Sequence, residues 1–303
     1  MEWETFDRRL GRGHPLYVTD GGMETDLIFN HGVELPEFAA FPLVGSAEGR
    51  ALLTAYYDGY AAIAVAAGAG LMLESATWRA NPDWGAKLGR PDLDAVNEAA
   101  IVMLHGLRDR YAVDDVVVSG TVGPRGAAGM DPDEAAAYHS PQLAAFKRAG
   151  ADLATAYTLS DVGEAIGIAR AGRAVGLPVA ISFTVETDGR LAGGGLLGAA
   201  ISTVDGDTPP DHFGVNCAHP AHIAQALDEP GDWPARVTCV RANASTMSHA
   251  ELDEATALDD EDPARFAIAF APLRRAFPRL SIVGGCCGTD ARHVAALWSG
   301  ARD

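Results

Sequence analysis

The sequence predicts a (β/α)8 barrel of the TIM type, from its length, its alternating segments and the absence of one motif. A chain of 303 residues exceeds the usual size of one domain, but barrels of this kind often reach it. Short β-rich runs alternate with longer alanine-rich runs from end to end, which favours parallel βαβ units. No G-x-G-x-x-G fingerprint follows the first β-rich run, which disfavours the competing open, doubly wound sheet without excluding it. We therefore expect a single barrel domain over residues 1–303.

Eight strands are expected, at residues 16–20, 70–74, 116–120, 151–157, 178–184, 212–217, 236–242 and 281–285. Helices are expected between them, including 47–67, 93–110, 132–149, 162–175 and 263–277. Pro132 and Pro263 lie beside acidic residues, a combination that suits the first turn of a helix. The polar segments 189–210 and 243–261 are expected to be loop insertions after the fifth and seventh strands. Both leave the C-terminal ends of strands, where barrel enzymes build their active sites.

Composition narrows the class of protein and its partners. Hydrophobic residues make up 48% and charged residues 21% of the chain, as in a globular protein with a large core. Lys and Arg total 23 against 41 Asp and Glu, so the formal net charge is −18. This excess repels nucleic acid and anionic membranes, and we expect neither as a partner. The N-terminus lacks the features of a secretory signal, and the most apolar window, 60–73, is too short to span a bilayer, so a cytoplasmic protein is expected.

Three of the four cysteines form a candidate metal site. Cys217 ends a Gly-Val-Asn-Cys run, and Cys286 and Cys287 follow two glycines, so they are expected at the tops of the sixth and eighth strands. Three thiolates without a fourth Cys or His suit a catalytic zinc ion (Zn²⁺) with one open position. From the residues alone, two alternatives stay open. The cysteines could be small buried hydrophobic residues, or Cys286 and Cys287 could form a redox pair. Cys239 is expected to pack as an ordinary strand residue.

With these residues in view, the chain resembles the homocysteine S-methyltransferase family over residues 16–297. The resemblance rests on DGGMET at 20–25, GTVGP at 120–124, SFTV and DGRL within 182–191, GVNC at 214–217 and GGCCGT at 284–289. It implies a zinc-bound barrel that moves a methyl group from a sulfonium or quaternary ammonium donor to the sulfur of homocysteine. It also implies that Cys217, Cys286 and Cys287 are the zinc ligands. Zinc would favour the deprotonated acceptor sulfur, which is the nucleophile in methyl transfer.

The chain departs from the family pattern at two places. After the fourth strand the family carries a Glu that helps to hold the homocysteine amino group, and this chain has Tyr157 there. The segment after the second strand is also changed, and Glu74 is predicted to take over the anionic role, with a solvated strand end as the alternative. Asp20 matches a family substrate contact, and its alternative is a turn residue. We predict Asp20, Glu74 and Tyr157 as the catalytic side chains.

Further substrate contacts are predicted at Glu24, Thr77, Trp78, Trp84, Thr184 and Asn216. Trp78, Trp84 and Tyr157 raise the hypothesis of an aromatic cage for a methylated cation, against the alternative of core or rim packing. Residues 81–85 are expected to be a loop, which would favour the cage. His219 and His222 follow Cys217 closely and are expected to start a helix or to lie behind the ligands.

The leading interpretation is a zinc-dependent methyltransferase with a small-molecule methyl donor and a small thiol acceptor, homocysteine by default. One alternative is a related zinc methyltransferase that uses an N-methylated amino acid or a betaine-like donor. Another is a non-catalytic barrel that holds zinc. The sequence leaves the methyl donor and the oligomeric state open, a homo-oligomer included.

Overall fold

A computed structural model describes residues 17–126 and 128–299, where eight parallel strands close into a barrel. The strands are β1 (Tyr17–Val18), β2 (Gly70–Glu74), β3 (Val116–Val122), β4 (Leu153–Leu159), β5 (Val179–Phe183), β6 (His212–Asn216), β7 (Val237–Ala242) and β8 (Ile282–Gly285). Each strand pairs with the next, and β1 pairs with β8 through Tyr17 and Ile282. The predicted barrel is confirmed and the open sheet is excluded. Of the predicted first strand, Leu16 lies outside the described residues.

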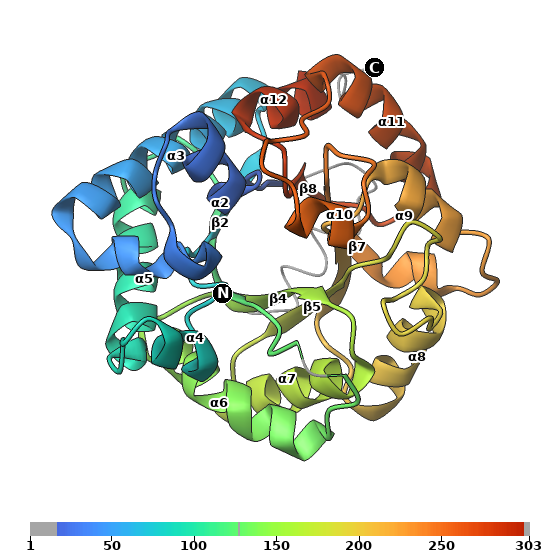
Figure 1. Cartoon of the computed structure of the whole chain (residues 1–303), viewed down its shortest axis with the longest axis horizontal. Coiled ribbons are helices and arrows are strands. Elements are labelled where there is room, and N and C mark those ends of the chain that lie inside the picture. The colour runs from blue at the N-terminus through green and yellow to red at the C-terminus, as the bar shows by residue number, and fades with distance from the viewer. Residues whose placement is uncertain (1–16, 127, 300–303) are drawn as a thin grey trace.

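The helices form a ring around the strands (Figure 1). The longer ones are α3 (Ala47–Ala67), α5 (Leu93–Arg108), α6 (Pro132–Arg148), α7 (Val162–Val175), α8 (Leu197–Asp207), α9 (Pro220–Ala226), α11 (Pro263–Ala276) and α12 (Ala291–Ser299). Shorter segments are α2 (Met23–Thr25), η1 (Asp26–Asn30), η2 (Pro36–Phe38), η3 (Phe41–Gly45), α4 (Pro82–Lys87), η4 (Trp233–Arg236) and α10 (His249–Asp253). As expected, α6 and α11 begin at prolines, and the preceding Asp131 and Asp262 accept hydrogen bonds from first-turn amides. Within the described ranges, we find no helix with the length and apolar character needed to cross a membrane.

Three segments expected to be loops contain helices, of which α10 in 243–261 is short. Helix α8 lies within 189–210 and buries Leu197, Ala200, Ile201 and Val204. This spacing forms one apolar stripe, which the Gly- and Thr-rich surroundings obscure in the sequence. Helix α4 occupies the expected loop at 81–85, because the Asn81 side chain accepts a hydrogen bond from the Trp84 amide at 3.2 Å and caps the first turn. Both loop predictions are wrong at these positions, whereas 243–261 is irregular apart from α10.

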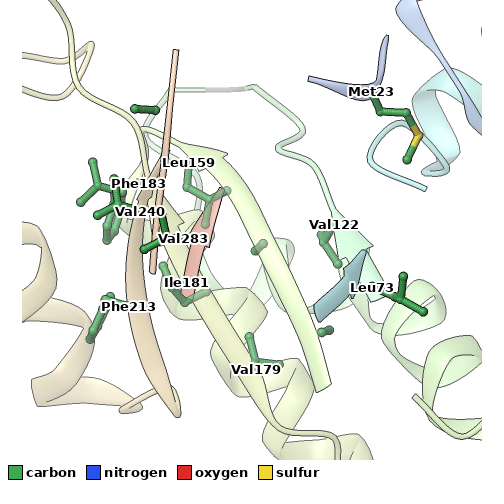
Figure 2. Packing of buried hydrophobic residues seen from close by; sticks show 14 of the residues in the cluster. Met23, Leu73, Val122, Leu159, Val179, Ile181, Phe183, Phe213, Val240 and Val283 are labelled. Atoms are coloured by element: carbon green, nitrogen blue, oxygen red, sulfur yellow. The ribbon is translucent and has the colours of Figure 1, made fainter. Parts of the chain in front are cut away.

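Strand side chains alternate between two cores. Val179, Ile181 and Phe183 of β5 pack in the large cluster between strands and helices (Figure 2). Ala180, between them, points into the barrel and joins a smaller cluster of Tyr17, Met72, Val117, Leu153, Cys239 and Ile282. Cys239 therefore packs as an apolar strand residue, as predicted. Because strands have a period of two, the next inward residues lie one layer closer to the C-terminal mouth of the barrel. That layer is polar and includes Glu74, Thr155, Ser182 and Arg241.

Candidate active site

A cavity of about 610 Å³, partly open to solvent, lies at the C-terminal ends of the strands. Nine of the predicted site residues line it: Asp20, Glu24, Glu74, Trp78, Tyr157, Asn216, Cys217, Cys286 and Cys287. The other three, Thr77, Trp84 and Thr184, are not among the lining residues. The structure therefore brings together residues from five separate parts of the predicted barrel at the mouth where a TIM barrel carries its chemistry.

The three cysteines converge at one side of this cavity. Their Sγ atoms all lie within 4.8 Å of one another, and those of Cys217 and Cys287 are 3.6 Å apart. Two thiolates on a tetrahedral zinc ion, with Zn–S bonds of about 2.3 Å, would be separated by about 3.8 Å, so the donor set fits zinc. Hydrogen bonds from the Cys217 and Cys287 thiols hold the pKa of Cys286 well below its usual range. The cluster thus favours a thiolate at Cys286.

The backbone of Cys217 is held in an uncommon conformation. Its φ of 57° lies in the left-handed region, which costs a non-glycine residue of the order of 1 kcal/mol or more. Its carbonyl oxygen accepts hydrogen bonds from His249 Nε2 at 2.7 Å, Asn243 Nδ2 at 3.0 Å and Thr184 Oγ1 at 3.3 Å. His249 Nδ1 in turn lies 3.1 Å from a carboxylate oxygen of Glu186. Thr184, predicted as a substrate contact, thus donates a hydrogen bond to the backbone of a cysteine.

The loop that follows β1 packs directly on the cysteine loop. A Cβ atom at Gly22 would lie 2.6 Å from the carbonyl oxygen of Cys286, so only glycine fits there. The Gly22 amide donates to the Thr289 carbonyl at 3.0 Å, and the Gly288 amide donates to Thr25 Oγ1 at 3.2 Å. These contacts fix the loop that carries Glu24, which lines the same cavity as the cysteines.

Arg241 is a buried cation in the cavity lining that the sequence analysis missed. It is 7% exposed, and its Nη2 lies 2.5 Å from Asp20 Oδ1. It also donates to the carbonyl oxygens of Gly21 and Gly285, each at 2.9 Å. The guanidinium carbon lies 4.8 Å from the centre of the Tyr157 ring. Arg241 therefore joins the first and last strand loops around the cavity floor.

Tyr157 and Glu74 form a buried pair in the cavity lining. The Tyr157 hydroxyl donates to Glu74 Oε1 at 2.7 Å, and the Thr121 hydroxyl donates to Oε2 at 3.2 Å. Burial raises the pKa of Tyr157 well above its usual value, so the phenol stays protonated and remains the donor. Glu74 is 2% exposed, which excludes the alternative of a solvated strand end.

The remaining two carboxylates of the cavity differ in their partners. Asp20 Oδ2 accepts a hydrogen bond from the Tyr56 hydroxyl at 3.1 Å, in addition to the Arg241 contact at Oδ1. Burial raises the pKa of Asp20 to about 6, although Arg241 acts to lower it. Burial also raises the pKa of Glu24 to about 7, and the negative charges of Asp20 and Cys286 add to the rise. Across residues 17–126 and 128–299, the Glu24 carboxylate has its own backbone amide as its one hydrogen-bond donor.

Glu24→Gln is expected to raise the stability of the metal-free protein at alkaline pH. The pKa of Glu24 rises from its usual 4.5 to about 7 on folding, so this group stabilises the fold at low pH and loses that contribution as the pH rises through about 7. The ionised carboxylate then costs roughly 2 kcal/mol, allowing for its partial contact with water. Urea unfolding at about pH 5 and about pH 8 measures the difference. An equal change in the free energy of unfolding at both pH values would contradict the raised pKa of Glu24.

The aromatic side chains do not form an open cage. The guanidinium carbon of Arg79 lies 4.2 Å from the Trp78 ring centre and 3.9 Å from the Trp84 ring centre. Trp84 donates its indole N–H to a backbone carbonyl at 3.2 Å and lies outside the cavity lining. Tyr157 faces Arg241. The hypothesis of a cage is therefore wrong in this form, because cations of the chain itself occupy faces of all three rings.

The other predicted contacts have structural partners. The buried Thr77 hydroxyl donates to the Thr121 carbonyl at 2.8 Å and ties the loop after β2 to β3. Asn216 lines the cavity, but its Oδ1 accepts from Ser182 Oγ at 2.7 Å and from the Thr158 amide at 2.9 Å. These two bonds fix the orientation of the Asn216 amide, whose Nδ2 lies 3.8 Å from Cys286 Sγ.

The histidines near Cys217 lie outside the metal cluster, as expected. The His219 side chain accepts a hydrogen bond from the Ala221 amide at 3.2 Å and so caps α9. The one group of potential metal ligands found in the described part of the chain consists of the three cysteines.

Comparison with known proteins identifies the family of this chain. Residues 17–299 match the model of the homocysteine S-methyltransferase family. The chain belongs to this family. Membership of the homocysteine S-methyltransferase family indicates a methyltransferase, and it confirms the resemblance drawn from the motifs.

Solved structures and curated proteins give more distant similarities. The metallated form of the homocysteine methyltransferase MmuM from Escherichia coli is 21% identical, with a TM-score of 0.73 over 96% of this chain and 98% of that chain. The oxidized form of the same E. coli protein gives a TM-score of 0.74 over 94% of this chain and 95% of that chain. At this identity the similarity shows the barrel fold.

The curated relatives are much longer proteins. A methionine synthase from Mycobacterium leprae is 32% identical over 157 residues, 48% of this chain and 12% of that protein. One from Mycobacterium tuberculosis is 35% identical over 135 residues, 44% of this chain and 11% of that protein. The matches therefore span only about a tenth of the length of the curated relatives.

Proposed function

We propose that this protein is a zinc-dependent methyltransferase that moves a methyl group from a small sulfonium or methylated-ammonium donor to homocysteine sulfur. The observation that carries the proposal is the cluster of three Sγ atoms within 4.8 Å of one another at the edge of the cavity. Three protein ligands leave a fourth tetrahedral position, which is the arrangement of catalytic zinc sites. Membership of the family supports methyl transfer as the reaction.

Cys217, Cys286 and Cys287 would hold the ion. Zinc supplies the Lewis acidity that keeps an acceptor thiol deprotonated near neutral pH. The chain's own residues prepare the ligands: the contacts of His249, Asn243 and Thr184 with the Cys217 carbonyl hold that residue in its strained conformation. Hydrogen-bond partners of a metal ligand typically raise the affinity of the site for the metal and fix the orientation of the ligand.

The remainder of the cavity suits a small cation. Its lining carries three carboxylates, Asp20, Glu24 and Glu74, and one guanidinium, that of Arg241. An excess of negative groups in a recessed site favours a positively charged donor. Met23, Phe38 and Trp78 add apolar surface that excludes water around the transferred methyl group. Holding donor and acceptor at close range then lowers the barrier without any further acid or base.

Zinc-loaded protein is expected to convert homocysteine to methionine with at least one cationic donor. The donor panel contains S-methylmethionine, S-adenosylmethionine and glycine betaine, and mass spectrometry detects the product. X-ray absorption at the zinc edge should show a nitrogen or oxygen ligand replaced by a fourth sulfur when homocysteine is added. Full zinc occupancy without methionine from any donor would favour the non-catalytic barrel instead. An unchanged zinc shell during turnover would exclude direct coordination of the acceptor.

A further inference from the structure

We infer that the Glu24 carboxylate binds the ammonium group of the acceptor and so selects an amino-acid thiol over a thiol without an amino group. The inference rests on the proposed function, because it assigns a residue of the same cavity to part of the proposed acceptor. It also changes the assignment made from the sequence, which gave this role to Asp20 and Glu74.

Asp20 and Glu74 already have partners at both carboxylate oxygens. Asp20 contacts Arg241 at 2.5 Å and Tyr56 at 3.1 Å. Glu74 accepts hydrogen bonds from Tyr157 at 2.7 Å and Thr121 at 3.2 Å. An ammonium group at Asp20 would compete with a guanidinium that already neutralises it, and at Glu74 it would compete with two fixed hydroxyls.

Glu24 has the opposite character. It lines the cavity, is only partly buried, and has no side-chain partner in the described part of the chain. Burial raises its pKa to about 7, so its ionised form is poorly solvated; the charge of Arg241 acts to lower that pKa, but Arg241 forms its ion pair with Asp20. An ammonium group placed there would give the carboxylate a direct ion-pair partner, and the partial exclusion of water would strengthen the interaction.

The position of Glu24 also suits an acceptor whose sulfur lies at the cysteines. Its loop touches the cysteine loop at Gly22, where a Cβ would lie 2.6 Å from the Cys286 carbonyl oxygen. Glu24, Cys286 and Cys287 all line this one cavity. An amino-acid thiol held in this cavity with its sulfur at the cysteines would direct its ammonium group to Glu24.

This assignment accounts for the departure at Tyr157. A phenol that stays protonated carries no charge to offer an ammonium group, and its hydroxyl is already donated to Glu74. Glu24, on the loop that follows β1, would supply the carboxylate that position 157 lacks.

The test compares homocysteine with 4-mercaptobutanoate, which has the same chain and carboxylate but no amino group. With zinc-loaded wild type and one fixed donor, kcat/KM is expected to favour homocysteine by about 10- to 100-fold, the usual effect of one charged hydrogen bond. Glu24→Gln should abolish this preference through a higher KM for homocysteine, with kcat/KM for 4-mercaptobutanoate changed by less than about 2-fold. Calorimetric binding of both thiols to zinc-loaded protein gives the same comparison without a donor.

Two control variants separate the explanations. Glu48→Gln, at an exposed position of α3, should leave both acceptors unchanged, and Glu24→Asp should recover part of the preference. Retention of the wild-type preference in a fully zinc-loaded Glu24→Gln protein would overturn the inference while leaving the proposed function in place. Wild-type protein that methylates neither thiol and binds neither would overturn the proposed function and this inference together.

Discussion

Cys286→Ala is expected to abolish zinc binding and methyl transfer, whereas Cys239→Ala is expected to preserve both. Cys286 Sγ is one of three sulfurs that lie within 4.8 Å of one another. Its low pKa, set by hydrogen bonds from the other two thiols, makes it the preferred thiolate of the cluster. Loss of a direct ligand should weaken zinc binding by more than the roughly 10- to 100-fold typical of an indirect partner. Cys217→Ala should behave in the same way.

Cys239 is the matched control because it carries the same thiol group as Cys286 but lies in a different environment. It is 2% exposed within the apolar layer of the barrel, and burial raises its pKa to about 12. Its thiol is therefore inert at neutral pH, and its replacement removes only some packing. Elemental analysis of the purified variants should give about one zinc per chain for wild type and Cys239→Ala. Full zinc content in Cys286→Ala would show that the cysteine cluster is not the metal site.

Arg241→Met is expected to destabilise the barrel by about 3–5 kcal/mol, the usual cost of removing one partner from a buried ion pair. The substitution leaves Asp20 buried at 4% exposure without its cation. It also removes the donors to the Gly21 and Gly285 carbonyls, which join the first and last strands at the mouth of the barrel. Urea unfolding of the metal-free proteins measures the loss independently of zinc and substrate.

The double variant Asp20→Asn/Arg241→Met distinguishes charge from packing. With residue 20 also neutral, the loss of Arg241 no longer leaves an unpaired charge there, so a substantial part of the lost stability should return. The loss in Arg241→Met should also be smaller at about pH 5 than at about pH 8. The pKa of Asp20 is already about 6 with Arg241 present, and it would rise further without it, so protonation relieves the buried charge at acid pH. Equal losses in the single and double variants, at both pH values, would assign the effect to packing alone.

The barrel and the placement of three cysteines at one end of it were predictable from the sequence because local patterns carry them. Eight β-rich runs alternate with helical runs, and closure follows from their number and from the parallel connections. Cys217 and Cys286 each follow a strand, so both were expected at the same end of the barrel. Helix α8 was missed because Gly- and Thr-rich surroundings conceal its apolar stripe. Helix α4 was missed because its Asn and Pro residues suggest a loop, although Asn81 caps its first turn.

Arg241 carried a signal that the sequence analysis did not use. It stands two residues after Cys239 on one strand, so it must share the inward face of the barrel and lie one layer nearer the mouth. A charged residue at such a position needs a buried partner. The sequence does not name that partner, because Asp20 lies on the first strand loop and meets Arg241 only when the barrel closes.

The sequence by itself determined the alternation of strands and helices, the cysteines at the strand ends and the membership of a methyltransferase family. These follow from periodicity and from motifs, which are local in the chain. Only the tertiary structure decided which polar side chains face the cavity and which are already satisfied. Asp20, Glu24 and Glu74 look alike as acidic residues near strand ends, yet closure of the barrel gives two of them internal partners and leaves Glu24 with its own amide alone among the described residues. Hydrogen bonds and ion pairs between distant loops depend on three-dimensional proximity, which local pattern does not encode.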